Sequence, residues 1–168
     1  IVGGYFDSNS IELGNEVTLT NNGNENGMII KYNIKGNVEW AKGIGGENGT
    51  ASIKSIVQTR DGGYLVGGEF ICYNIRLEDG IIISKPSNAE ADWQAIMIIK
   101  YNQEGKIEWA RGIGGATYDT LHSLIETRDN GFMITMNKGH SYESYIKKFD
   151  KKGNLQWSKL SRDLDNIY

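Results

Sequence analysis

The residues that could act as a proton donor and acceptor pair are His122 and Glu126. They lie four positions apart in Leu121–Thr127, a run of apolar and polar residues that predicts a β-strand. Residues i and i+4 of a strand point to the same face, about 13 Å apart, which is too far for direct proton transfer. We therefore interpret both side chains as ordinary polar residues of a strand and predict no catalytic residues.

The residues that could bind a ligand are Asp92 and Trp93, in the segment KPSNAEADWQ from Lys85 to Gln94. This segment holds the only proline of the chain and a tryptophan that lies outside the repeats described below. A polar, acidic tip with one indole could stack on a sugar ring or hold a peptide. The alternative is that Trp93 folds onto the hairpin beneath it.

The composition predicts neither a metal nor a cofactor. Asp61-Gly62-Gly63 lacks the alternating acidic residues of a calcium loop, and the two GIGG segments precede no predicted helix, unlike a phosphate-binding loop. The single cysteine, Cys72, excludes an internal disulfide and a multi-thiolate metal site. A net charge of -3 argues against nucleic-acid binding, and the longest apolar runs are too short to cross a bilayer.

All of these candidates lie in a chain built from repeats. The segment MIIKYNIKGNVEWAKGIGG from Met28 recurs as MIIKYNQEGKIEWARGIGG from Met97, and a weaker copy, YIKKFDKKGNLQWSKL, begins at Tyr145. A second block, SIVQTRDGGYLVGGEF from Ser55, recurs as SLIETRDNGFMITMNK from Ser123. The opening IVGGYF matches LVGGEF of that block. It is therefore a repeated strand and not the mature N-terminus of a trypsin-like protease, whose GDSGG motif is absent.

Each copy is predicted to be a four-stranded antiparallel unit. In the second copy the predicted strands cover residues 53–59, 64–70, 97–101 and 106–113; in the third, the first two cover 121–127 and 132–138. Asx-x-x-Gly segments predict the hairpin turns between strands three and four. An indole that buries ~150–250 Å² in strand four would dock one sheet on the next. The structural residues of the repeat are Gly36, Trp40, Gly105, Trp109, Gly153 and Trp157.

These units resemble the tandem β-propeller repeats of bacterial secreted and surface proteins. The pattern is GGYLVGG…IIKYNxxGKIEWARGIGG at Gly62 to Gly115, and the match extends over nearly the whole chain. The units are more loosely similar to the PQQ-like propeller repeat. In that repeat a Gly is followed four residues later by a Trp, which docks one blade on the next. The resemblance implies an all-β fold of propeller blades in a secreted or cell-surface bacterial protein. A parallel β-solenoid is the structural alternative, although the Asx-x-x-Gly turns favour antiparallel pairing.

On this interpretation the chain holds just under three blades. Residues 1–46 form a partial first blade with an extra hairpin at 10–20, and residues 51–115 form a second blade with an extra hairpin at 74–84. Residues 119–160 form a third blade without the hairpin, and residues 161–168 start a further blade or form a tail. Closed propellers have about four to eight blades. We therefore expect a fragment of a larger propeller, completed by adjoining blades of the same or another chain.

The extra hairpins suggest a function, because loops that protrude from a rigid scaffold often bind partners. The alternative is that the hairpins only extend the sheet. We predict a non-catalytic binding, display or scaffold module that binds an unknown protein or glycan, with no nucleic-acid partner and no membrane insertion. The alternatives are part of a propeller enzyme, quinoprotein-like or polysaccharide-acting, and a purely structural spacer.

Overall fold

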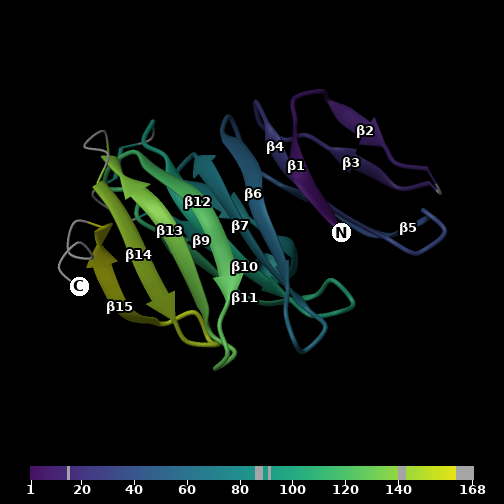
Figure 1. The fold of residues 1–168 in the computed structure, drawn as a ribbon. Helices are drawn as coiled ribbons and strands as arrows, with labels where there is room; N and C mark the ends of the chain where they lie inside the picture. Colours follow the sequence, from purple (N-terminus) through teal and green to yellow (C-terminus); the bar gives the residue numbers. More distant parts are fainter. Residues whose placement is uncertain (15, 86–88, 91, 140–142, 162–168) are drawn as a thin grey trace.

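The computed structural model describes residues 1–14, 16–85, 89–90, 92–139 and 143–161, and it consists of β-strands joined by short turns (Figure 1). Short apolar and β-branched runs between Gly and Asx turns favour strands over helices. The strands are β1 (Val2–Phe6), β2 (Ser10–Glu12), β3 (Thr18–Thr20), β4 (Asn26–Tyr32), β5 (Val38–Ile44), β6 (Thr50–Gln58), β7 (Tyr64–Ile71), β8 (Asn74–Arg76), β9 (Ile82–Ser84), β10 (Ala95–Tyr101), β11 (Ile107–Ile113), β12 (Asp119–Glu126), β13 (Phe132–Lys138), β14 (Glu143–Phe149) and β15 (Leu155–Leu160). One 3-10 turn, η1 (Glu78–Gly80), precedes β9, and within the described ranges no helix is long and apolar enough to cross a membrane.

The strands form three main sheets and two hairpins, and every pairing between them is antiparallel. The first sheet has the order β1-β4-β5, the second β11-β10-β7-β6 and the third β12-β13-β14-β15. The hairpins β2-β3 and β8-β9 are separate two-stranded sheets. The predicted all-β class with four-stranded antiparallel sheets is therefore confirmed, and the parallel solenoid is excluded for the described strands.

The Asx-x-x-Gly segments form the predicted tight turns. Asn33 Oδ1 accepts hydrogen bonds from the backbone N–H groups of Lys35 (2.9 Å) and Asn37 (3.0 Å), and Gly36 adopts a φ of +81°. In the turn that begins at Asp150, its Oδ1 accepts the same two hydrogen bonds, from the backbone N–H groups of Lys152 (2.8 Å) and Asn154 (2.9 Å). A side chain that accepts from the backbone two residues on, followed by a glycine at positive φ, fixes the hairpin locally.

The three sheets stack face to face, with the second in the middle (Figure 1). Alternate residues of β10 point to opposite faces: Met97 and Ile99 enter an apolar cluster with the first sheet, and Ile96 and Ile98 enter one with the third. All seven residues of β10 are buried, because both faces of this sheet are covered. The described sheets form an open stack and not a closed ring.

The repeated Val-Gly-Gly stretch lets the next sheet approach closely. β6 lies against β1 and β4, and β12 lies against β6 and β7. A Cβ on Gly67 would lie 2.5 Å from Leu121 Cδ2, and one on Gly3 would lie 2.6 Å from Ile56 Cδ1. Since real Cβ atoms do not approach other atoms this closely, glycine at these positions sets the spacing between sheets.

Candidate functional site

The repeated tryptophans lie where one sheet meets the next. The Trp40 ring stacks on Tyr101 of the second sheet, with centroids 6.1 Å apart, and meets Tyr64 edge-on at 5.9 Å. It also lies against the Asx-x-x-Gly turn of that sheet, because a Cβ on Gly105 would be 2.9 Å from the indole. Such contacts bury apolar area and fix the angle between sheets.

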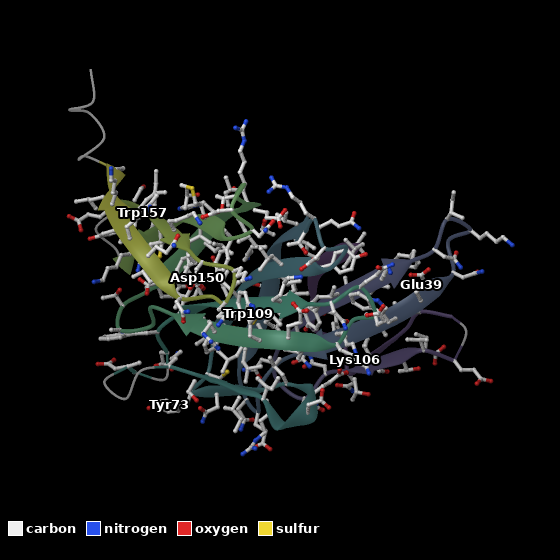
Figure 2. The ribbon with its side chains drawn as sticks, turned by 90° about the horizontal axis from the view of Figure 1, so that it is seen from below. Glu39, Tyr73, Lys106, Trp109, Asp150 and Trp157 are labelled. Atoms are coloured by element: carbon white, nitrogen blue, oxygen red, sulfur yellow. The ribbon has the colours of Figure 1, made fainter. Side chains whose placement is uncertain are left out.

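Trp109 makes the same kind of contact at the junction of the second and third sheets. At the ends of the stack, the first sheet exposes such a turn, at Gly36, and the third sheet exposes such a ring, Trp157. Trp109 stacks on Phe132 at 5.7 Å, and a Cβ on Gly153 would be 3.1 Å from the indole. In Figure 2 Asp150, which begins the turn of the third sheet, lies between Trp109 and Trp157. Trp157 is 41% exposed, and a Cβ on Gly36 would meet no atom within 4 Å.

The extra hairpin of the second unit is part of the packing. Ile75 and Ile83 of β8-β9 are buried in the cluster between the first and second sheets. Lys42 Nζ of the first sheet lies 2.6 and 2.8 Å from the carboxylate oxygens of Glu78 in η1. The apolar face of the hairpin thus covers the outer part of the junction.

The predicted tip is described only in part, because residues 86–88 and 91 lie outside the described residues. Asp92 is exposed and Trp93 is half-buried. Lys85 Nζ donates to the carbonyls of Glu90 and Trp93, and the Trp93 N–H donates to Glu90 O at 3.2 Å. Burial lowers the pKa of Lys85, and the nearby Cys72 and Asp92 partly offset this. The hydrogen bonds of the Lys85 side chain therefore lie within the segment and join its two ends.

Two carboxylates, Glu126 of β12 and Glu69 of β7, connect the second and third sheets. His122 is exposed, and Glu126 accepts a hydrogen bond from the Arg60 N–H of the second sheet at 3.2 Å. Lys54 Nζ lies 3.5 Å from the buried carboxylate of Glu69, which also accepts from the Leu121 N–H at 2.8 Å. His122 and Glu126 therefore have separate environments, and the contacts of Glu126 are structural.

A groove at the junction of the second and third sheets is the candidate site, because it combines an apolar floor with charged side chains. It has a volume of about 440 Å³ and lies between the β6–β7 turn, the β10–β11 hairpin and the β12–β13 turn. Its floor is apolar, from Leu65, Trp109 and Phe132. Its charged rim includes Arg60, Asp61, Lys100, Glu108, Glu126 and Lys151.

Lys100 organises one wall of the groove. Its side chain is buried, and Nζ donates to Thr59 Oγ1 (3.0 Å) and Asp61 Oδ1 (2.9 Å) and lies 3.5 Å from Glu108 Oε2. Desolvation raises the pKa of Asp61, but hydrogen bonds from Thr59, Gly63 and Lys100 outweigh it and lower the pKa to about 2. A buried ammonium group is tolerated here because its donors are satisfied.

The arrangement of a Lys, an Asp and a Thr recurs in the third sheet. Lys148 Nζ donates to both carboxylate oxygens of Asp129, at 3.0 and 2.9 Å, and the Thr127 hydroxyl donates to Asp129 Oδ1 at 2.5 Å. The hydrogen bond from Thr127, followed by that from Lys148, lowers the pKa of Asp129, and desolvation opposes this shift without cancelling it. The buried lysine and its partners are thus part of the repeat.

The opposite wall holds the two sheets together. Arg60 Nη1 donates to the carbonyls of Thr127 (3.2 Å) and Arg128 (2.9 Å) in the third sheet. Trp109 Nε1 donates to Lys151 O at 3.2 Å. The floor is therefore rigid, while the exposed Lys151 side chain and the half-exposed Glu108 carboxylate remain available to a ligand at the rim.

Sequence reasoning did not predict this groove, because its residues come from four separate segments. The substitutions between copies were the only signal: Lys151 stands where the second copy has Gln103, and Glu126 where it has Gln58. Within the described residues, no group of three or more His, Cys, Asp and Glu side chains could hold a metal ion.

Comparison with known proteins gives no identification. No protein-family model matches the chain. No curated protein matches it either.

Proposed function

We propose that this chain is a run of β-propeller blades that serves as a non-catalytic binding or display module of a secreted or cell-surface bacterial protein. The repeated junction supports the propeller: each internal Trp packs on the Asx-x-x-Gly turn of the next sheet. The open Gly36 turn and the exposed Trp157 are complementary halves of that contact. Further units of the same kind would extend the stack at both ends, as in a ring of blades.

The groove between the second and third sheets carries the binding function. Its volume of about 440 Å³ falls in the range of small-molecule sites. A rigid floor reduces the entropy that binding costs, and a rim with both signs of charge offers donors and acceptors to a polar ligand. A glycan has many hydroxyl groups and little charge, so it suits this rim better than a strongly charged chain. The ligand class we propose is therefore a glycan.

A glycan array tests this proposal, with Lys151→Gln as the groove variant and Lys152→Gln as its control. Lys151 lines the groove, whereas Lys152 is exposed in the same turn, and glutamine occurs naturally at the matching position, Gln103. We expect the unmodified chain to bind a defined set of glycans and Lys151→Gln to bind them at least about tenfold more weakly, since a hydrogen bond to a charged group contributes ~1.5–3 kcal/mol. Lys152→Gln should bind normally.

Two results would contradict the proposal. One is the absence of any glycan binding by the folded chain while a peptide library yields ligands, which would change the ligand class. The other is glycan binding that Lys151→Gln leaves unchanged, which would place the site elsewhere on the chain.

A further inference from the structure

The third unit lacks the extra hairpin, and the surface that the hairpin would cover has changed in composition. In the second unit Ala51, Phe70 and Ile99 are buried beside the hairpin residues Ile75 and Ile83. Ala51 pairs with Phe70 across β6 and β7, and Ile99 lies on the next strand, β10. The hairpin therefore covers an apolar wall.

Three ionisable residues stand at the matching positions of the third unit. The same strand register pairs Asp119 with Lys138 and Lys147 with Ile134. Asp119 therefore replaces Ala51, Lys138 replaces Phe70 and Lys147 replaces Ile99. Loss of the hairpin thus coincides with the replacement of an apolar wall by a charged one.

A cavity of about 380 Å³ occupies this place. Its walls include Gly114, Asp119, Met136, Lys138, Tyr145 and Lys147. This volume lies near the lower end of small-molecule sites, ~300–1,000 Å³. It is separate from the groove described above, with which it shares no lining residue.

The Asp119 carboxylate is fixed by its own loop. The side chain accepts hydrogen bonds from the Gly115 N–H (2.7 Å) and the Thr117 hydroxyl (2.9 Å), and the residue is only 1% exposed. These donors hold the carboxylate in place, and it makes no ion pair with Lys147 among the contacts of the described residues.

Lys147 provides the cationic group of the cavity. Burial lowers its pKa, the nearby Asp119 raises it, and Lys138 lowers it. In the part of the chain that the structure describes, its ammonium group has no hydrogen-bond or ion-pair partner. A half-buried ammonium group without a partner is costly, and an entering anion would relieve that cost.

We propose that this cavity binds the carboxylate of an acidic monosaccharide, with Lys147 as the anchoring cation and Lys138 as a second positive charge. The cavity accommodates a single ring better than an extended chain, and Tyr145 and Met136 give it an apolar wall for the face of a sugar. The second unit has no such site, because Ile75 and Ile83 fill the matching space.

Titration with glucuronate, followed by amide NMR shifts, tests this inference. Lys147→Ile introduces the residue that the second unit has at the matching Ile99, so the variant is expected to remain folded, which circular dichroism checks. We expect glucuronate to bind and glucose to bind at least tenfold more weakly. We expect Lys147→Ile to reduce glucuronate affinity at least tenfold, and Lys152→Gln, in an exposed turn, to leave it unchanged.

The inference would be overturned by no shifts with glucuronate in the folded chain, by equal affinities for glucuronate and glucose, or by unchanged glucuronate affinity in Lys147→Ile. If the cavity bound free sulfate but did not bind glucuronate, the inference would also be overturned, since an acidic sugar would then not be the ligand. Because Lys151→Gln alters only the groove, failure here and failure of the proposed groove are distinguishable.

Discussion

Gly105→Ala tests whether the contact between Trp40 and the neighbouring turn stabilises the stack, and Gly36→Ala is its matched control. Both glycines occupy the same turn position with nearly equal φ, +79° and +81°. A left-handed backbone costs an L-residue about 1–2 kcal/mol, and both variants bear this cost. Only Gly105→Ala also places a Cβ 2.9 Å from the indole, where overpacking adds about 1–3 kcal/mol.

We therefore expect losses of about 1–2 kcal/mol for Gly36→Ala and about 2–5 kcal/mol for Gly105→Ala in the free energy of unfolding. Urea unfolding, followed by far-UV circular dichroism, measures both. Gly153→Ala should fall between them, because its closest approach to the indole of Trp109 is 3.1 Å. If the two main variants lost the same free energy within about 0.5 kcal/mol, the Trp40 contact would not stabilise the junction.

Three further predictions use urea unfolding in the same way. Because the pKa of Asp61 in the folded chain is about 2, below its usual value of 3.8, the unfolded chain binds more protons between these pH values. The free energy of unfolding should therefore fall as the pH drops from 4 to 2, and Asp61→Asn should flatten that dependence. Ile75→Ala should lower the free energy of unfolding by about 2–5 kcal/mol. Ile82 is 48% exposed on the same hairpin, so Ile82→Ala should cost much less, and equal costs would mean that the hairpin is not part of the core. Arg60→Gln should cost about 1 kcal/mol and Arg128→Gln nothing measurable, and the reverse order would contradict the role of Arg60 in joining the second and third sheets.

The strands and turns could be predicted because their causes are local. An Asx side chain and a glycine three residues later define the hairpin by themselves, and apolar runs between such turns define the strands. Predicted strand 132–138 matches β13, and predicted strand 106–113 differs from β11 by one residue. The matched tryptophans indicated where sheets meet, since a large ring recurring at one position needs a repeated surface to pack on.

The groove could not be predicted, because it depends on how sheets are spaced and rotated. Arg60 and Glu126 are 66 residues apart in the chain, and only the packing of β12 against β6 brings them together. The extra hairpins show the same limit. The hairpins at 10–20 and 74–84 were predicted, but the burial of Ile75 and Ile83 depends on the space that the first and second sheets leave between their outer strands.

Two physical explanations exist for the ionisable residues that the third unit has where the hairpin is missing. They differ in how far these side chains should be exposed to water. An apolar wall that lost its cover would be exposed to water, and polar residues there would prevent association. Solubility alone is best served by exposed charges. Asp119 is buried, and burial lowers the pKa of Lys147, so both residues bear a desolvation cost that exposed charges would avoid. A cost of this kind is expected where charges must be held in a fixed arrangement for a ligand.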